Sequence, residues 1–429
     1  MPGVPSSRGC DACRQQKKKC DQLTPLCSRC ARLGIPCIGS GERRYKFRHM
    51  AAPDQSSSKQ TPTTVAQAGS PSAAASSMQL ATIVPSNRAT LDAGHFISAL
   101  QVTDVRFDLR IYGPFFVELP RRLGRNRALD ASVRALAVSF PSVHTHQYTP
   151  DMYKAYGEAL RCLRASLGDP ATARSVETMC AVYLVMICQG WIGRGGDFFP
   201  SHGEAIAHML NTAAAAQNWR GEFEAEVTNT LLVIVLLESF GNHKIRLDPS
   251  LWATSEPPVI ARPNRPPVNQ ATDIECLRIP TLAAVSSYTR NVQGNLPAIQ
   301  STYEVLQNDL AKMKVLLSEA SETNLTLLAR QIHARRQTGY GTLLLLGLMA
   351  NWALSVFGIG DPRALELEKA TLVDEIMDLA QRASQYRPLA ASAMPGFLMA
   401  AKTMTDDAAR LARLEELLAL YRSDFPASN

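Results

Sequence analysis

The chain has 429 residues, of which 46% are apolar, and its formal net charge is +7. This length allows two or three domains at most, and the apolar content is sufficient for a large buried core. The charge is unevenly placed: residues 1–50 hold eleven lysines and arginines against three acidic residues, a balance of +8, which leaves −1 for the other 379 residues. Such asymmetry indicates a polyanionic partner, either nucleic acid or an anionic membrane surface.

The amino-terminal residues, Met1 to Ser7, contain no apolar stretch. We therefore expect no secretory signal and no passage into an oxidising compartment. The ten cysteines should then be reduced thiols, and a cluster of them favours metal ligation over disulfide bonds.

Six cysteines follow a regular spacing, in which the first three recur as the last three, displaced by 17 positions: Cys10, Cys13, Cys20, Cys27, Cys30 and Cys37. A C-x2-C pair lets two thiolates reach one tetrahedral zinc ion, and a third cysteine closes the half-site. Six sulfurs complete two tetrahedra only if two of them bridge both metals. The segment is too small for its own apolar core, so zinc must supply most of its folding energy. An incidental cysteine cluster or a disulfide knot is the alternative interpretation.

This pattern resembles the fungal zinc-cluster (Zn2Cys6) transcription factors, and the match covers residues 10–37 without a gap. The resemblance implies two Zn²⁺ ions, with Cys10 and Cys27 as the bridging thiolates. It also implies that Pro25 makes a tight turn in the loop between the two halves. It further implies a fungal source and a nuclear location.

The two halves differ in charge, because only the first holds a dense run of cations between its second and third cysteines. The residues of this run that we predict to bind DNA are Arg14, Lys17, Lys18 and Lys19. A lysine there can donate to the acceptors of guanine in the major groove, while neighbouring cations hold phosphates. By resemblance, Lys17 matches the lysine that contacts a CGG triplet, and Arg14 and Lys19 match its flanking basic positions. We assign Lys18 to phosphate; the alternative is a solvated basic face.

The zinc cluster is expected to form a DNA-binding domain over residues 8–49, whose basic tail, Glu42 to His49, follows the DNA backbone and contributes to nuclear import. Residues 50–91 are rich in Ala, Ser, Thr, Pro and Gln, which predicts a flexible, disordered linker. Related proteins often dimerise through a coiled coil after the cluster, but residues 38–95 contain no apolar heptads. A monomer and a homodimer through the following domain both stay open.

Residues 92–429 have the pattern of a large all-α domain. One helix should begin at Thr149 and Pro150, a second should follow a capping box at Ser201, and a third should fill residues 223–240. Leu411, Leu414, Leu418 and Tyr421 recur at helical spacing near the end of the chain. The strict alternation of Val105 to Ile111 predicts a strand or extended segment instead.

Residues 337–360 carry no charge and are long enough to span a bilayer. Six polar side chains and five glycines interrupt the run, so we expect a buried core helix and no membrane contact. Four cysteines outside the cluster lie in apolar helical contexts and are expected to be small core residues: Cys162, Cys180, Cys188 and Cys276.

Short motifs in residues 92–429 resemble the fungal-specific transcription factor domain that often follows a zinc cluster: Tyr112-Gly113-Pro114-Phe115, Leu119 to Gly124, His202 to Ala205, Arg387-Pro388-Leu389 and Leu417 to Phe425. The resemblance implies a helical regulatory domain without catalysis. The chain contains no complete catalytic or phosphate-binding motif of the common kinds, so we do not expect an enzyme.

The sequence thus predicts a nuclear, zinc-dependent transcription factor that binds double-stranded DNA at CGG-type promoter elements and regulates transcription by RNA polymerase II. Its expected partners are DNA and the transcription machinery or co-regulators, and its targets could be a metabolic or secondary-metabolite gene cluster. An RNA-binding or metal-buffering protein is the second hypothesis. The absence of aromatic residues between Cys10 and Cys37 argues against RNA binding, since single-stranded RNA is usually held by stacking. An enzyme fused to a DNA-binding arm is the third.

Overall fold

The computed structural model describes residues 9–23, 26–37, 88–192, 202–216, 219, 221–253, 274–318 and 326–425. These form two separate units, a small cysteine-rich unit and a large helical one, which are described in turn. The basic tail at residues 42–49 and Pro25 lie outside the described residues, as does the linker expected over residues 50–91 except for its last residues, 88–91, which belong to helix α3 (Arg88–Leu100).

The small unit contains two short helices, α1 (Asp11–Gln15) and α2 (Ser28–Leu33). Among its described residues, 9–23 and 26–37, the buried ones include four cysteines and no large aliphatic side chain, while Leu23, Leu26 and Leu33 are exposed. A unit without an apolar core must be stabilised by something else, as the sequence predicted.

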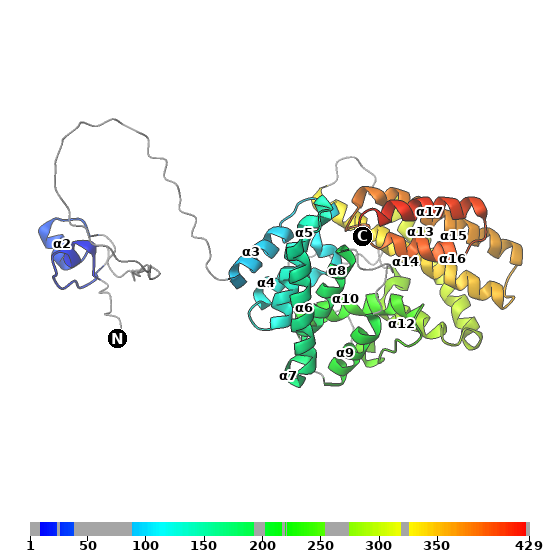
Figure 1. Cartoon of the computed structure of the whole chain (residues 1–429), viewed down its shortest axis with the longest axis horizontal. Helices are drawn as coiled ribbons and strands as arrows, with labels where there is room; N and C mark the ends of the chain where they lie inside the picture. Colours follow the sequence, from blue (N-terminus) through cyan, green and yellow to red (C-terminus); the bar gives the residue numbers. More distant parts are fainter. Residues whose placement is uncertain are drawn as a thin grey trace, which may run out of the picture. The chain divides into compact units, whose positions relative to one another are not determined.

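The large unit is helical throughout its described residues, and no strand occurs among them (Figure 1). This confirms the predicted fold class. After α3 the long helices are α5 (Arg127–Thr145), α6 (Pro150–Gly168), α8 (Val176–Trp191), α9 (Gly203–Ala216), α10 (Glu222–Ser239), α12 (Ile279–Tyr288), α13 (Leu296–Ser318), α14 (Leu327–Val356), α15 (Pro362–Ala383), α16 (Met394–Thr403) and α17 (Ala408–Arg422). Short helices connect them: η1 (Val105–Phe107), η2 (Leu109–Tyr112), η3 (Pro114–Glu118), α4 (Leu119–Arg122), α7 (Pro170–Ala173), α11 (Ser250–Ala253), η5 (Glu275–Leu277), η6 (Gln293–Asn295) and η7 (Ser384–Tyr386).

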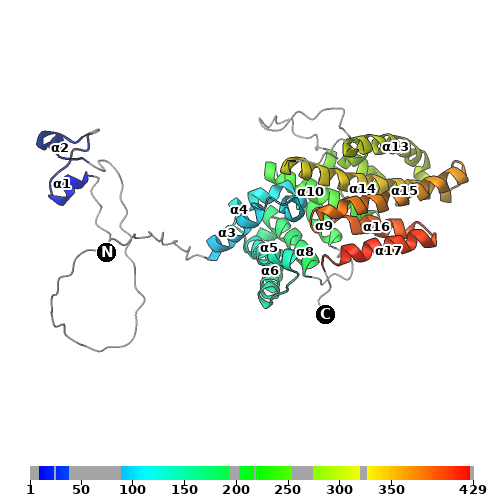
Figure 2. The same cartoon turned by 90° about the horizontal axis from the view of Figure 1, so that it is seen from above.

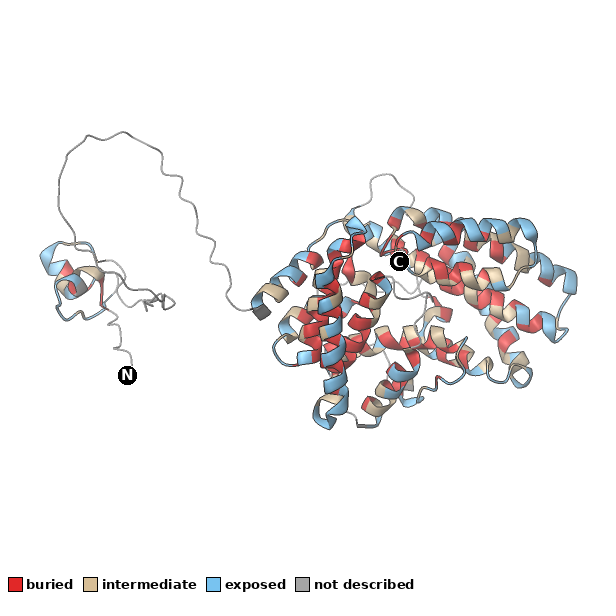
Figure 3. Ribbon diagram, viewed as in Figure 1, coloured by how far each residue is buried: buried red, intermediate tan, exposed pale blue. Residues whose placement is uncertain are grey.

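Two apolar cores hold these helices together, and the inward faces are buried while the outer faces are exposed (Figure 3). In the first core α5 packs against α3, α6 and α8. In the second, α14 packs against α13, α15 and α16, which lie side by side in both views (Figures 1 and 2). Helix α10 serves both, because Leu232 is buried in the first core and Leu236 in the second.

Local sequence signals place most helix ends correctly. Thr149 caps α6 with Pro150 at its first position, and α10 ends at Ser239, two residues before Gly241. In α17, Leu414, Leu418 and Tyr421 face the second core. Helix α9 begins at Gly203, close to the expected start, whereas Ser201 of the proposed capping box lies outside the described residues. The four cysteines expected in the core are all buried: Cys162, Cys180, Cys188 and Cys276.

The strand predicted for Val105 to Ile111 is wrong, because the segment forms the two short helices η1 and η2. The reason is a repeated Asp-x-Arg unit. The carboxylates of Asp104 and Asp108 each accept the backbone N–H two residues ahead, at 3.0 Å, and each also pairs with the arginine there. Such local side-chain caps favour a turn over an extended backbone, and here they override the alternating apolar pattern.

Helix α14 contains most of the uncharged run at residues 337–360 that is long enough to span a bilayer. By length and composition it could cross a bilayer, but 61% of its most apolar window is buried by other parts of the chain. Its side chains Leu343, Leu344 and Leu348 belong to the second core. The helix is therefore a central packing element of the helical unit, as the sequence predicted.

Helix α14 is closely packed at one of its glycines, which leads to a prediction that an exposed glycine of another helix can control. A β-carbon at Gly341 would overlap the Phe397 ring of α16, whereas Gly157 in α6 is exposed with nothing near its missing β-carbon. We expect Gly341→Ala to destabilise the helical unit by roughly 1–3 kcal/mol through overpacking. Gly157→Ala should stabilise it by roughly 0.5–1 kcal/mol because alanine favours a helix. Urea unfolding followed by circular dichroism measures both changes; equal shifts in the same direction would contradict this packing.

Candidate metal centre and nucleic-acid interface

The two short helices of the small unit begin in the same way, each directly after a cysteine. Cys27 caps α2, and its Sγ accepts the backbone N–H of Cys30 at 3.5 Å. Cys10 stands in the corresponding place before α1. The backbone N–H of Cys10 donates to Cys20 Sγ at 3.5 Å, and that of Cys27 donates to Cys37 Sγ at 3.3 Å. The 17-residue repeat of the sequence is thus also a repeat of backbone hydrogen bonds.

The helices also end alike. The N–H of Lys18 donates to the carbonyl of Cys13 at 2.8 Å, and the N–H of Ile35 donates to the carbonyl of Cys30 at 3.2 Å. Between them Lys17 and Gly34 occupy equivalent positions, and both have left-handed backbones, with φ of 52° and 61°. Glycine adopts this conformation without cost, while a lysine there is held against its steric preference. Lys17 therefore has a fixed, strained backbone at the exposed end of α1.

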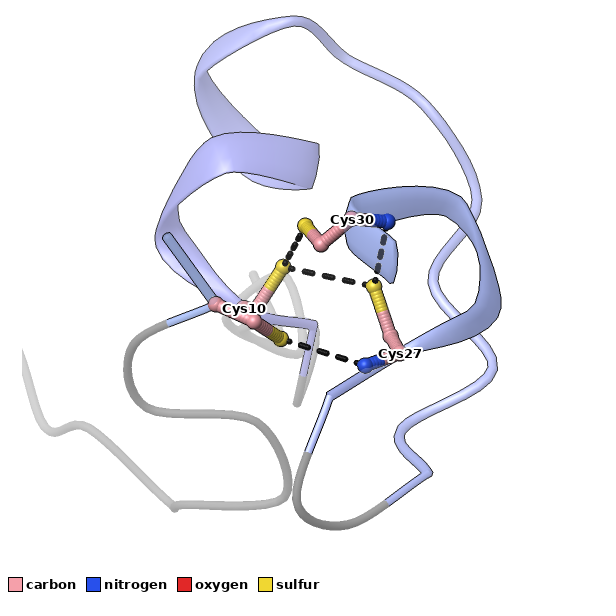
Figure 4. Close-up of side chains that lie close together, drawn as sticks. Cys10, Cys27 and Cys30 are labelled. Atoms are coloured by element: carbon pink, nitrogen blue, oxygen red, sulfur yellow. Dashed lines mark hydrogen bonds between the residues drawn. The ribbon is translucent and has the colours of Figure 1, made fainter. Parts of the chain in front are cut away.

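The six sulfur atoms gather into two groups of four. One group contains Cys10, Cys13, Cys20 and Cys27, and the other contains Cys10, Cys27, Cys30 and Cys37. Within each group all sulfurs lie within 4.8 Å of one another, and none of the six cysteines is joined in a disulfide, as expected for metal ligands. Cys10 and Cys27 are common to both groups. Figure 4 shows Cys10, Cys27 and Cys30 converging, with Cys10 Sγ 3.8 Å from Cys27 Sγ and 3.5 Å from Cys30 Sγ.

These distances fit zinc. With Zn–S bonds of about 2.3 Å, sulfurs at the corners of a tetrahedron lie about 3.8 Å apart. Cys13 Sγ is also 3.8 Å from Cys27 Sγ. Two tetrahedra that share one edge need six sulfurs, of which two are shared, and this is the set that the fold assembles. The donor set is all thiolate and closed, which is typical of structural zinc rather than catalytic zinc.

The pKa values of the cysteine thiols are shifted in different directions, and the shifts follow the same 17-residue repeat. The backbone N–H of Cys13 lowers the pKa of Cys10, and that of Cys30 lowers the pKa of Cys27. Burial raises the pKa of Cys13 to about 11. Helix-capping thus favours the thiolate form at the two shared sulfurs, while burial disfavours it at their neighbours. Bound cations would offset the cost of burying these sulfurs.

The predicted DNA-binding residues lie on and after α1. Lys17, Lys18 and Lys19 are all exposed, and none forms an ion pair with another described residue. Arg14 belongs to α1, but its side chain lies outside the described residues. The lysine run immediately precedes Cys20, so the cysteines fix its two ends. Unpaired cations on a rigid support are suited to contact a polyanion.

Sequence reasoning missed two residues that join the halves of the small unit. The Arg29 guanidinium donates to Gln16 at 2.5 Å and lies 3.9 Å from Cys13 Sγ. The Asp21 carboxylate accepts the N–H of Ser28 at 3.1 Å, and hydrogen bonds to Ser28 lower the pKa of Asp21. Neither residue belongs to the cysteine pattern, so spacing gave no signal for them.

Several motifs that resemble the fungal-specific domain meet inside the helical unit. Arg387 forms a two-pronged ion pair with Asp424, at 2.9 and 2.7 Å, and its guanidinium lies over the Tyr421 ring. Tyr112 accepts hydrogen bonds from Tyr183 at 2.9 Å and from Trp191 at 3.1 Å. These contacts tie connecting segments to long helices, so the motifs have a packing role here.

Comparison with known proteins agrees with the geometry of the small unit. Residues 8–46 match the fungal Zn(2)-Cys(6) binuclear cluster domain. The quinic acid utilization activator of Emericella nidulans is 58% identical over 31 residues, which are 7% of this chain and 4% of that protein. The match thus covers only a small part of the relative's length. No solved structure matches the chain.

These matches confirm the recognition and the metal predicted from the sequence: residues 8–46 form a zinc binuclear cluster domain, and the domain binds two zinc ions. Proteins with this domain are DNA-binding transcription regulators, generally nuclear, rather than enzymes. The helical unit fits the predicted architecture, but it lies outside the matched residues. The roles of individual cysteines and lysines stay predictions.

Proposed function

We propose that this Zn(2)-Cys(6) protein is a nuclear transcription factor that recognises CGG-type promoter elements and regulates transcription by RNA polymerase II. The observation that carries the proposal is the assembly of two four-cysteine groups that share Cys10 and Cys27, directly beside the exposed run Lys17 to Lys19. The family match supports DNA as the partner.

In this proposal each four-cysteine group holds one zinc ion, which supplies structural cross-linking and no catalytic chemistry. Lys17 reads guanine in the major groove in this proposal, since a lysine ammonium can donate to the O6 and N7 acceptors of guanine and Lys17 is exposed. Lys18, Lys19 and Arg14 contact phosphates on either side and set the register. The second half has Gly34 after helix α2, where the first half has Lys17 after α1, and it supports the first half.

We assign residues 8–49 to DNA binding, residues 50–91 to a linker and residues 92–429 to regulation. The helical domain is the proposed site of homodimer formation and of contacts with co-regulators or the transcription machinery, since it provides a large folded surface. The target genes are proposed to form a metabolic or secondary-metabolite cluster. We draw no substrate from the activator of Emericella nidulans, because its similarity spans only 31 residues.

A selection experiment tests this function without assuming a target. The zinc-loaded full chain is incubated with a pool of random-sequence duplexes at near-physiological salt, and bound molecules are amplified and sequenced over several rounds. We expect enrichment of CGG triplets, singly or in pairs, and their spacing would report the oligomeric state. A pool without any enriched motif would contradict sequence-specific recognition, and an enriched motif without CGG would contradict the proposed target.

A further inference from the structure

The helical unit contains a large polar cleft that the DNA-binding function does not use. Its volume is about 1410 Å³, and it is lined by η1, the end of α13, and the facing sides of α14 and α15. Ligand sites commonly measure roughly 300–1,000 Å³, so this space suffices for a small molecule.

The two helices that form its walls present polar stripes to it. Helix α14 contributes Arg330, His333 and Gln337, and helix α15 contributes Glu375, Asp378 and Arg382. Within each helix the three residues are spaced by three and four positions, which places them on one face. Neighbouring helices normally meet through apolar residues at such positions. Charged residues there indicate that the two faces border a solvent-filled site.

Gln337 lies at the carboxyl-terminal end of the α14 stripe and is only 3% exposed. Its side-chain amide has no hydrogen-bond partner among the described residues, although it lines the cleft. The amide opens onto the cleft, so its donor and acceptor atoms are available to whatever occupies that space. A ligand that reaches into the cleft could hydrogen-bond with this amide.

The cations of the cleft outnumber the anions that could neutralise them. Lys314 pairs with Glu375, which also accepts the Tyr340 hydroxyl, and Arg106 pairs with Asp104. Arg330 and Arg382 form no ion pair with any described residue, and the one remaining acid is Asp378. This leaves one positive charge uncompensated in the cleft.

A histidine and a tyrosine also line the cleft as a hydrogen-bonded pair. His333 Nδ1 lies 2.7 Å from the Tyr386 hydroxyl. Burial, followed by the charges of Arg336 and Arg382, lowers the pKa of His333, while the charge of Arg330 acts on Tyr386. A neutral imidazole thus remains available as a hydrogen-bonding group in the cleft.

We propose that this cleft binds a small carboxylate-bearing molecule, whose carboxylate is held by Arg330 and Arg382 and oriented by the amide of Gln337. Arginine is suited to this role, since its planar guanidinium donates two parallel hydrogen bonds to one carboxylate. The cleft lies wholly in the helical unit, so the site is separate from the zinc cluster. A ligand bound in this way would bridge α14 and α15, so the helical unit would respond to the concentration of a small molecule.

The test measures binding of succinate, citrate and benzoate to the zinc-loaded full chain by isothermal titration calorimetry, in the absence of DNA. We expect saturable binding of at least one acid and none of its methyl ester. Arg382→Gln and Arg330→Gln should each weaken binding by about tenfold or more, because each removes a charge-assisted contact. Arg363→Gln, an exposed change of equal charge at the start of α15, should leave binding unchanged.

Gln337→Leu separates a ligand-binding role from a structural one. Because the amide has no protein partner, leucine should preserve or raise the melting temperature while it weakens acid binding. Absence of saturable binding at millimolar acid, or binding that survives both arginine changes, would overturn the proposal. A chain that binds an acid but shows no DNA preference would refute the proposed function and leave this site standing.

Discussion

Replacing Cys10 with serine is expected to weaken both zinc sites at once, whereas replacing Cys20 with serine should weaken only one. Cys10 belongs to both four-cysteine groups, while Cys20 belongs to one. Structural zinc contributes roughly 10–16 kcal/mol of apparent binding free energy in small zinc domains at neutral pH, so the loss of a ligand is a large effect. In a zinc-buffered solution, Cys20→Ser should retain about one tightly bound zinc ion and Cys10→Ser almost none.

The measurement is the zinc-to-protein ratio of the full chain after dialysis against a competing chelator, by atomic emission. Cys27→Ser should behave like Cys10→Ser, and Cys37→Ser like Cys20→Ser, because the repeat places them equivalently. Cys188→Ser, a buried cysteine of the first core, controls for loss of a thiol elsewhere and should retain both metals. Equal zinc loss from Cys10→Ser and Cys20→Ser would contradict the sharing of Cys10.

Replacing Lys17 with glycine is expected to preserve or improve zinc retention while it weakens binding to DNA. Its backbone has a left-handed φ of 52°, which costs a residue with a β-carbon about 1 kcal/mol. Lys17→Gly should therefore hold zinc against a chelator at least as well as the natural chain. Binding to a CGG duplex should nevertheless weaken by roughly 1–3 kcal/mol, because the contact to guanine is lost.

Two companion variants separate the causes. Lys17→Ala should lose the same DNA contact and keep the backbone strain, so it should resemble Lys17→Gly in DNA binding but not in zinc retention. Lys18→Ala should weaken binding to CGG and scrambled duplexes alike and reduce the salt dependence, as expected for a phosphate contact. If Lys17→Ala also weakens both duplexes equally, Lys17 does not read bases.

The zinc cluster was predictable because its chemistry fixes its spacing. Two thiolates on a C-x2-C pair can reach one metal only at such separations, so the ligands and their repeat are visible in the sequence. The same repeat contained a second signal: Gly34 lies 17 positions after Lys17, and its left-handed conformation could have predicted that of Lys17. Asp21 and Arg29 gave no such signal, since their hydrogen bonds join one half of the repeat to the other and have no counterpart 17 positions away.

In the helical unit, local chemistry was informative and long-range packing was not. Caps such as Thr149 mark helix ends because they satisfy backbone groups within a few residues. The alternating pattern of Val105 to Ile111 led to a wrong strand prediction. The side chains of Asp104 and Asp108 accept backbone N–H groups two residues ahead, and this favours turns instead. The polar cleft could not be predicted from the sequence, since Gln337 and Arg382 are brought to one space only when α14 packs against α15.

The central claim is that a zinc-held lysine surface reads DNA sequence. The most direct test titrates the zinc-loaded full chain against a CGG-bearing duplex and a scrambled duplex of equal length, at near-physiological salt. We predict that the CGG duplex binds at least about tenfold more tightly, and that chelation of zinc abolishes this preference. Equal binding to both duplexes, with a steep dependence on salt, would show that phosphate contacts dominate and would contradict the claim.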